Sequence, residues 1–513
     1  MDTDGIMSTG IIYQYLSNFT SNLDLSFAQR SMGHGIENMI ENYKNRGSDT
    51  DYKFKVKSVP KDTDLLIIVD SSSNSVDACK YLQENFSLDR QDIVIIDHHD
   101  VDVENPYALL VNCKLGDYPN RDLSGSAVVY KVCQVLDGYT GEDLADNYSD
   151  LVAIGLVGDM MNVANMENRF LINQGIREIK SAGVQQILKK SRTDFYRGIS
   201  STDISFKLSP IIGACSRLDQ IELALELLTT DDEDRMGILA KEMIALNEQR
   251  KTSQKEIVES VVKNVDDSNN LIMLVDNTID SGFRGLIATE VVARYGKPVF
   301  VLREIKDESG NIVKYGGSAR GLGNIPFKDM CEESNLFTFA TGHQLAFGIE
   351  FYAENMSKIY DYFNENLNAE DFERVIVYDL EVDASELEEI DLKEIEAFAR
   401  IVGTGFQEPK FKLTGLTLEE GFTKKLGDHV RAVMGKNKDT VKIHCENNFA
   451  LMKFRSNEEY AKELEDIFYD PFTTFVEVKA IGSLNLNVFY NFGTRETQIT
   501  KQMFVEDYKY TVG

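Results

Sequence analysis

The sequence has few cysteines and no long apolar run. Its six cysteines are scattered along the chain and form no Cys-x-x-Cys pair, so neither a disulfide framework nor a thiolate zinc site is indicated. No apolar run approaches the ~20 residues of a membrane-spanning helix. The start, Met-Asp-Thr-Asp-Gly, lacks the basic and apolar regions of a signal peptide. We therefore expect a cytoplasmic protein that does not associate with membranes.

Basic residues are also in the minority. Lysine and arginine together number 54, against 84 aspartates and glutamates, which gives a formal net charge of −30 at pH 7. This balance argues against a broad basic surface for coating duplex nucleic acid. A substrate that carries phosphate would have to bind a local basic groove or metal ions.

The chain is long enough for several domains. Its 513 residues, 42% of them hydrophobic, correspond to about three domains at roughly 150 residues each. Two short, almost wholly apolar runs at 65–69 and 93–96 end in aspartate and are typical of buried parallel strands in an α/β sheet. Ligands bind at the carboxyl ends of such strands, so we expect Asp70 and the Asp97-His98-His99 triplet to be displayed there.

The middle of the chain predicts a long helix and a second α/β unit. Residues 230–265 carry apolar side chains at helical spacing and no proline, which predicts one long connecting helix. Strand-like runs at 271–275 and 298–302 flank a helical stretch at 285–295. These three elements predict a second, smaller α/β unit.

The last part of the chain predicts a small β-domain, in the form of a barrel. Its short alternating runs lie at 441–443, 475–478 and 488–492. Aromatic residues in these runs are candidates for stacking on bases, although alternate residues of any strand face inward, so packing in the core is the simpler interpretation. The candidates are Phe475, Phe489, Tyr490 and Phe492.

Several carboxylates and histidines lie where a metal site could form. Asp2 and Asp4 are two residues apart, so an extended segment would turn both to the same side; the alternative is an N-terminal turn followed by a helix. Asp70 has an alternative as a helix N-cap. Asp159 follows an apolar segment, where burying a lone carboxylate would cost several kcal/mol unless it met a cation.

Oxygen ligands, one or two imidazoles and no thiolate favour Mn²⁺ or Mg²⁺ over structural zinc. Two such ions ~3.5–4 Å apart can activate a water and stabilise the leaving oxygen in phosphoryl transfer. The reaction class that these residues indicate is phosphoester hydrolysis.

The order of the motifs resembles a known family. An Asp-x-Asp-Gly at residue 2, a strand-end aspartate, Asp-His-His and a later aspartate resemble the motifs of the DHH phosphoesterases. Within that superfamily the chain resembles the RecJ exonucleases, which degrade single-stranded DNA from the 5′ end. Further segments that are similar to the RecJ family lie at 30–36, 123–128, 203–210, 228–250, 282–285, 317–320 and 342–343, and in the tail at 403–411, 481–487 and 505–507.

This resemblance implies a fold and its division. The fold is α/β: a DHH phosphoesterase domain with a parallel sheet, joined by a long helix to a smaller α/β DHH-associated domain, then an OB-like β-domain that binds nucleic acid. The implied boundaries are 1–200 for the DHH domain, 201–265 for the connecting helical region, 266–365 for the DHH-associated domain and 366–513 for the OB-like domain.

The resemblance also implies roles at the metal site. Asp97 would orient the histidines as a hydrogen-bond acceptor, and His99 would face the scissile phosphate. Asp70 would bridge two divalent cations, Mn²⁺ or Mg²⁺. The implied metal ligands are Asp2, Asp4, Asp70, His98 and Asp159.

A second group of residues is implied to bind DNA. Arg217 would clamp a substrate phosphate through a bidentate contact and take part in catalysis, while Ser318 and Arg320 would form the pocket for the 5′-terminal phosphate. Arg30 and His343 are further candidates for the same groove. Their alternatives are a surface position for Arg30 and backbone hydrogen bonding in a glycine turn for His343.

The chain departs from the family pattern at its start. In the family, a strand and a histidine four residues upstream precede the first aspartate, which is residue 2 here. Either the N-terminus is truncated, or one metal site is incomplete.

The sequence therefore predicts a metal-dependent 5′→3′ exonuclease for single-stranded DNA that acts in repair, recombination or replication. Expected partners are single-stranded DNA with a 5′ end, and a single-strand-binding protein or helicase. One alternative is a DHH phosphodiesterase for short oligonucleotides or cyclic dinucleotides. The other is a catalytically inactive DHH scaffold that binds DNA or replication proteins.

Overall fold

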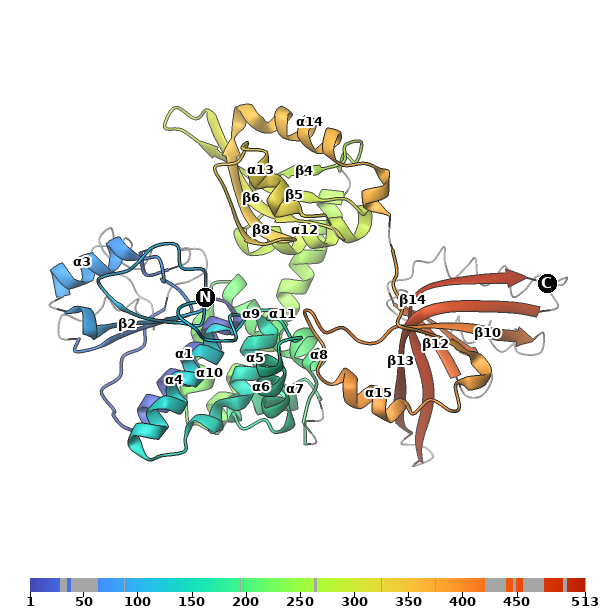
Figure 1. Cartoon of the computed structure of the whole chain (residues 1–513), viewed down its shortest axis with the longest axis horizontal. Helices are drawn as coiled ribbons and strands as arrows, with labels where there is room; N and C mark the ends of the chain where they lie inside the picture. The colour runs from blue at the N-terminus through green and yellow to red at the C-terminus, as the bar shows by residue number, and fades with distance from the viewer. Residues whose placement is uncertain are drawn as a thin grey trace. The chain divides into compact units, whose positions relative to one another are not determined.

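The chain forms two compact units in a computed structural model, Met1–Arg374 and Val375–Gly513. The structure describes residues 1–27, 35–37, 63–86, 88–193, 195–196, 198–262, 265–323, 325–373, 375–419, 440–445, 449–454, 475–491 and 496–512. Figure 1 shows the elements in chain order. Within this part of the chain, no helix is long and apolar enough to cross a membrane.

A three-stranded parallel sheet holds the strand ends that the sequence singled out. Its order is β1-β2-β3, with β1 at Leu66–Val69, β2 at Ile93–Asp97 and β3 at Leu109–Asn112. β1 and β3 each pair in parallel with β2. The strands are rich in isoleucine, leucine and valine, which suit a pleated surface covered by helices. The predicted parallel strands are confirmed, and their carboxyl ends lie at one edge.

Helices complete the first α/β part. The first of them, α1, is buried along most of its length and contacts both α4 and α5. The helix α5 is apolar almost throughout, and its residues 149–157 are buried, so it lies inside the fold. The helical segments of this part are α1 (Thr3–Ser17), α3 (Val76–Phe86), η2 (Arg90–Asp92), α4 (Gly125–Thr140), η3 (Ala145–Tyr148), α5 (Ser149–Gly158), α6 (Met166–Arg177) and α7 (Ala182–Lys190).

A helical region connects the two α/β parts. Its longest member, α11 (Glu233–Val262), has 30 residues and confirms the helix predicted at 230–265. Leu239 and Met243, four residues apart, are fully buried on one face of it, as expected for an amphipathic helix. The preceding segments are α8 (Ser201–Asp203), η4 (Ile204–Leu208), α9 (Ser209–Arg217) and α10 (Ile221–Thr229).

The second α/β part is a five-stranded mixed sheet of order β4-β5-β6-β8-β7. β4 and β5 are parallel and the other pairs are antiparallel. Its core is aromatic, with the Phe363 ring 5.4 Å from that of Phe327 and 6.2 Å from that of Phe300. The elements are β4 (Ile272–Val275), α12 (Ser281–Tyr295), β5 (Val299–Lys306), β6 (Ile312–Arg320), α13 (Phe327–Glu333), β7 (Phe339–His343), β8 (Ala346–Tyr352), η5 (Ala353–Asn355), α14 (Met356–Asn366) and η6 (Ala369–Phe372).

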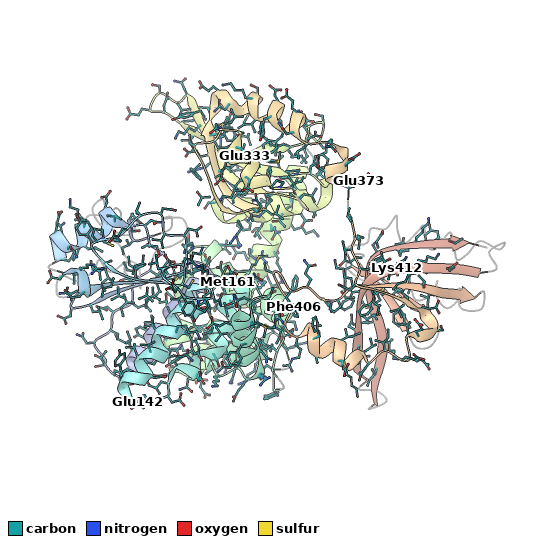
Figure 2. All side chains as sticks on the ribbon, in the orientation of Figure 1. Glu142, Met161, Glu333, Glu373, Phe406 and Lys412 are labelled. Atoms are coloured by element: carbon teal, nitrogen blue, oxygen red, sulfur yellow. The ribbon has the colours of Figure 1, made fainter. Side chains whose placement is uncertain are left out.

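The second unit is a six-stranded mixed sheet of order β11-β12-β14-β13-β10-β9. β10 and β11 are not neighbours in this order but also contact each other, so the sheet curls back on itself. The side chain of Lys412, on β10, is labelled in Figure 2. The elements are β9 (Leu380–Asp383), η7 (Ala384–Glu386), α15 (Leu392–Ala399), β10 (Phe411–Glu419), β11 (Thr440–Cys445), β12 (Phe449–Phe454), β13 (Phe475–Asn491) and β14 (Glu496–Val512).

One strand prediction in this unit was wrong. The runs 475–478 and 488–492 were expected as separate strands, but 475–491 form the single strand β13. The partner β14 is equally long and pairs with it from Val476 to Asn491, so the ladder continues where the local pattern weakens. Of the proposed stacking residues, Phe492 and the side chains of Phe475, Phe489 and Tyr490 lie outside the described residues.

The aromatic core predicts a clear difference between two phenylalanines. We expect Phe363→Ala to lower the free energy of unfolding by about 3–5 kcal/mol, because it leaves a cavity among packed rings. Phe339→Ala is the matched control, since Phe339 is 46% exposed on β7, and we expect a change within about 0.5 kcal/mol. Urea denaturation followed by fluorescence measures both, and equal effects would contradict the packing described.

Candidate metal centre and active site

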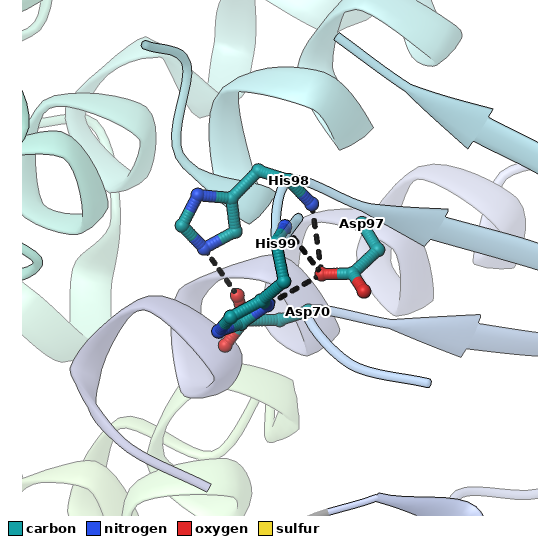
Figure 3. Close-up of side chains that lie close together, drawn as sticks. All are labelled: Asp70, Asp97, His98 and His99. Atoms are coloured by element: carbon teal, nitrogen blue, oxygen red, sulfur yellow. Dashed lines mark hydrogen bonds and ion pairs between the residues drawn. The ribbon is translucent and has the colours of Figure 1, made fainter. Parts of the chain in front are cut away.

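Two strand ends deliver the first residues of the site. Asp70 directly follows β1, and its backbone N–H donates to Ile96 O at 2.9 Å. Its φ is 58°, a left-handed conformation that costs a residue other than glycine about 1–3 kcal/mol. Asp97 ends β2, and His98 and His99 follow it. Figure 3 shows these four side chains grouped at the strand ends.

Three carboxylates from different elements surround His98. Its Nε2 lies 3.3 Å from Asp70 Oδ1, 3.6 Å from Asp159 Oδ2 and 4.0 Å from Asp4 Oδ2. Asp4 lies in the first turn of α1, and Asp159 is the C-cap of α5. Asp4, Asp70 and His98 are all at least nine-tenths buried. The fold therefore brings together four of the five predicted metal ligands.

The fifth predicted ligand, Asp2, has a different local role. Asp2 is the N-cap of α1, and its Oδ1 accepts from Gly5 N at 3.2 Å. The expectation of an extended Asp2-to-Asp4 segment was wrong, because Asp4 is already helical; the turn followed by a helix is what forms. Among the described residues, the groups able to hold a metal ion include Asp4 but not Asp2.

Two buried carboxylate oxygens of this cluster have no hydrogen-bond donor in the described part of the chain. Among the described residues, neither Asp4 Oδ2 nor Asp70 Oδ1 accepts a hydrogen bond, although His98 Nε2 approaches Asp70 Oδ1. Buried, adjacent negative charges are unfavourable unless a cation compensates them. The donor set of carboxylate oxygens and an imidazole, with no thiolate, fits Mn²⁺ or Mg²⁺.

Glycines make room for this cluster. A Cβ on Gly125, at the start of α4, would lie 2.5 Å from Asp70 Oδ1 and 3.0 Å from Asp4 Oδ2. A Cβ on Gly155, in α5, would also overlap the carboxylate of Asp4. The Asp4 carboxylate is held in place by the backbone N–H of Ser126, which donates to its Oδ1 at 3.2 Å. The two helices thus approach the acidic cluster more closely than any side chain would permit.

Burial and mutual repulsion shift the pKa values of these carboxyl groups. Burial raises the pKa of Asp70 well above its usual range, and the negative charges of Asp4 and Asp2 raise it further. The same causes raise the pKa of Asp159 to about 8. Burial lowers the pKa of His98, which favours the neutral imidazole that a metal requires.

Asp97 and His99 form a separate pair beside the cluster. Asp97 Oδ1 lies 2.7 Å from His99 Nδ1 and accepts from the backbone N–H of His98 at 2.8 Å. Its Oδ2 accepts from the N–H and the hydroxyl of Ser73, at 3.1 and 2.7 Å. Burial alone would raise the pKa of Asp97, but the hydrogen bonds from His99 and Ser73 outweigh it and hold the pKa below its usual range.

These bonds assign different roles to the two histidines. The hydrogen bond to Asp97 raises the pKa of His99, despite partial burial. The His99 side chain is half exposed, whereas that of His98 is buried. Because the oxygens of Asp97 are already occupied by donors, we regard Asp97 as the residue that orients His99 and not as a metal ligand.

Two predicted DNA-binding arginines meet at the start of α12. Arg217, at the end of α9, donates from Nη1 to Gly282 O at 3.0 Å. Arg320 ends β6, and a Cβ on Gly285 would lie 2.5 Å from its Nη2. Gly282 and Gly285 are one turn apart, so both arginines pack against the first turns of this helix.

The other predicted contacts are less closely grouped. Ser318 is half-buried on β6, two residues before Arg320. His343 is exposed at the end of β7, and its contact with DNA stays a prediction. Arg30 lies outside the described residues.

Comparison with known proteins agrees with the motif order. Residues 1–156 match the profile of the DHH family, N-terminal domain. Over 496 residues the chain is 26% identical to a Bacillus subtilis protein named as an SPbeta prophage-derived single-strand DNA-specific exonuclease, YorK, covering 90% of this chain and 80% of that protein. Over 425 residues it is 27% identical to the single-stranded-DNA-specific exonuclease RecJ of Bacillus subtilis. The chain thus carries a DHH family domain over residues 1–156 and is similar to RecJ proteins.

The fold agrees with that comparison. The crystal structure of Thermus thermophilus RecJ in complex with Mn²⁺ matches with a TM-score of 0.71 at 19% identity, covering 99% of this chain and 67% of that one. The complex of the same protein with Mg²⁺ gives a TM-score of 0.67 at 18% identity. The match with Bacillus subtilis RecJ covers 80% of this chain but only 50% of that protein.

Sequence reasoning missed residues that support the site. Asn112 ends the apolar strand β3 just as Asp97 ends β2, a signal that could have found it. Ser73 lies three residues after Asp70 in a serine-rich loop, which gives no indication of its bond to Asp97. Gly125 and Gly155 could not have been found, because only the packing of α4 and α5 shows what their missing side chains would displace.

The cluster predicts that metal binding depends on Asp70. We expect Asp70→Asn to weaken Mn²⁺ binding by roughly tenfold or more, since even the partners of metal ligands contribute about 10–100-fold to affinity. Asp77→Asn is the control, because Asp77 is exposed in the first turn of α3. Calorimetric titration of the metal-free protein measures both, and equal affinities would refute the assignment.

The raised pKa of Asp159 predicts how metal-free stability varies with pH. A carboxyl group whose pKa is raised on folding stabilises the protein below its ordinary pKa, and for Asp159 that contribution is lost as pH rises toward about 8. We therefore expect the unfolding temperature of the wild type, relative to that of Asp159→Asn, to fall between pH 5 and pH 8. Mn²⁺ should stabilise the wild type more at pH 8 than at pH 5, because fewer protons compete. A difference between the two proteins that does not vary with pH would contradict this account.

Proposed function

We propose that this protein is a metal-dependent exonuclease that hydrolyses phosphodiester bonds of single-stranded DNA from the 5′ end. The observation that carries the proposal is the convergence of Asp4, Asp70, His98 and Asp159 beside the Asp97–His99 pair. The cofactors that we propose are two divalent cations, Mn²⁺ or Mg²⁺, because the carboxylate oxygens of Asp4, Asp70 and Asp159 lie around the nitrogen of His98 and suit these ions. The similarity to RecJ proteins named as single-stranded-DNA-specific exonucleases supports the substrate.

The residues of the site have different roles in hydrolysis. Bound divalent cations supply a water of lowered pKa and stabilise charge on the phosphate oxygens. Asp4, Asp70 and Asp159 supply the negative charge that retains the cations, and His98 supplies a neutral nitrogen ligand. His99 is oriented by the bond from its Nδ1–H to Asp97, and in its protonated form, which its raised pKa favours, its Nε2–H donates a hydrogen bond to the scissile phosphate. This bond stabilises the charge that develops there.

The start of α12 is our candidate for the pocket of the 5′-terminal phosphate. Arg217 and Arg320 both pack there, and Ser318 lies on the same strand as Arg320. A helix start favours anions because its backbone N–H groups are unpaired, and the side chain of the N-cap Asp280 makes no capping hydrogen bond. Binding of the 5′-terminal phosphate here would fix the position of the 5′ end, so cleavage would proceed in the 5′→3′ direction.

The second unit is our candidate for binding the strand beyond the cleavage site. Lys479 on β13 and Lys509 on β14 are directly paired, and both are exposed. Like charges directly opposite each other destabilise a sheet. Glu477 Oε1 lies 3.8 Å from Lys479 Nζ, and a phosphate would add a negative charge between the two lysines. The described Tyr508 and Tyr510 pack against the core of the unit.

Such an enzyme would act in DNA repair, recombination or replication. Single-stranded DNA with a 5′ end arises in each of these processes, and a helicase or a single-strand-binding protein is the expected partner that supplies it. The net charge of −30 suits local binding of one strand better than coating of a duplex.

End-labelled DNA tests the proposal directly. With Mn²⁺ we expect mononucleotides to be released from the 5′ end of linear single strands, while closed circles and duplexes resist. His99→Ala should lower kcat by about 10²–10⁴-fold without weakening Mn²⁺ binding, because the metal is held by other residues. Arg320→Ala should reduce the preference for a 5′-phosphate end.

Three outcomes would overturn this function. Release only from 3′ ends or cleavage of closed circles would exclude a 5′ end pocket. A preference for di- and trinucleotides over long strands would favour the alternative phosphodiesterase. Mn²⁺ binding without any hydrolysis would favour a scaffold that binds DNA.

A further inference from the structure

Asn112 ends the third strand of the parallel sheet beside the residues of the site. It terminates β3 and is paired in register with Asp97 on β2. Its side chain is 8% exposed. Asp70, Asp97 and Asn112 thus stand at the carboxyl ends of three adjacent strands, with a carboxylate on the first two and an amide on the third.

The backbone partners of Asn112 fix the orientation of its amide. Its Oδ1 accepts from Lys114 N at 2.8 Å, and its Nδ2 donates to His99 O at 2.9 Å. A backbone N–H can only donate and a carbonyl can only accept, so the reversed amide would lose both bonds. The second proton on Nδ2 is donated to Ser73 Oγ at 3.1 Å.

Ser73 passes this connection on to Asp97. Because its oxygen accepts from Asn112, its hydroxyl proton is directed to Asp97 Oδ2 at 2.7 Å. Asp97 in turn accepts from His99 Nδ1 at 2.7 Å. The hydrogen bonds therefore form a closed ring that connects Asn112 to His99 by two routes. One is the direct bond from Asn112 to the carbonyl of His99, and the other runs through Ser73 and Asp97 to the imidazole of His99.

We propose that Asn112 and Ser73 are positioning residues that hold the imidazole of His99 in its working orientation. The proposal rests on the function assigned to His99 above and goes beyond it, because neither residue touches the metal ligands through the bonds of this ring. Ser73 is 2% exposed and Asp97 is fully buried, so water cannot readily replace a lost partner. Without the Asn112 amide, the backbone carbonyl of His99 loses a hydrogen-bond donor. Ser73 Oγ also loses the donor that directs its hydroxyl proton to Asp97.

Steady-state kinetics on single-stranded DNA with Mn²⁺ make the first test. We expect Asn112→Ala to lower kcat by roughly 10–100-fold, since a small displacement of a catalytic group costs about this much, with KM and Mn²⁺ affinity within about twofold of the wild type. Asn85→Ala is the matched control, because Asn85 is an exposed amide on α3. A raised KM at unchanged kcat, or weakened Mn²⁺ binding, would overturn the proposal.

A double-mutant cycle shows whether Asn112 acts through His99. If it does, Asn112→Ala should lower kcat no further in a His99→Ala background. Ser73→Ala should lower kcat by a smaller factor in Asn112→Ala than in the wild type, because both changes break the same ring. Independent, multiplicative effects would refute the proposal, and Ser73→Ala carries the same tests if Asn112→Ala does not fold.

A spectroscopic readout separates this inference from the proposed function. In metal-free protein labelled with ¹⁵N at its six histidines, the resonance lost in His99→Ala identifies His99. We expect its Nδ1–H to be protected from solvent exchange in the wild type and to exchange at least about tenfold faster in Asn112→Ala. Unchanged exchange would overturn the positioning role even if the enzyme is active. A wild type without nuclease activity would overturn the function, while the exchange measurement would still decide the positioning.

Discussion

The structure of the site depends on the repulsion among three carboxylates, of which Asp4 and Asp70 are buried and Asp159 is partly buried. Asp4, Asp70 and Asp159 surround one imidazole at distances of 3.3–4.0 Å from its Nε2, and oxygens of Asp4 and Asp70 lack hydrogen-bond donors among the described residues. In the absence of cations, the protein offsets this repulsion by holding protons, as the raised pKa of Asp159 shows. Divalent cations replace those protons, so metal binding, protonation and local stability are one coupled equilibrium.

The fold meets this electrostatic demand with unusually close packing. The first turn of α1 carries Asp4 between α4 and α5, and Gly125 and Gly155 leave space where any Cβ would collide with a carboxylate. Asp70 keeps a left-handed backbone conformation at the end of β1. Strain of this kind persists where many surrounding contacts hold the residue in place. The strained residue is therefore itself part of the candidate metal site.

Neutral polar residues hold the charged residues of the site in place through hydrogen bonds. The acceptor capacity of Asp97 is filled by Ser73, His98 and His99, so its charge serves orientation and not metal ligation. Asn112 closes the ring from the neighbouring strand. The same strand edge therefore performs two tasks, holding cations with carboxylates on one side and directing an imidazole with a buried hydrogen-bond network on the other.

The sequence alone determined the chemistry and the order of the elements. Aspartates at the ends of apolar runs predicted a parallel sheet with ligands at its carboxyl edge, since strand period and burial are local properties. The long helix and the second α/β unit were predicted for the same reason, and four of the five expected metal ligands meet in space.

Only the tertiary structure decided the rest, because it depends on contacts between residues far apart in the chain. No local pattern shows that Gly125 faces Asp70, that Asn112 donates to His99, or that Arg217 and Arg320 meet at the start of α12. At Asp2, by contrast, a local pattern predicted the wrong conformation. Its spacing from Asp4 suited an extended segment, but the burial of α1 extends the helix to Thr3 and leaves Asp2 as its cap. Likewise, the ladder with β14 merged two expected strands into β13, since cross-strand hydrogen bonds outweigh a weak local pattern.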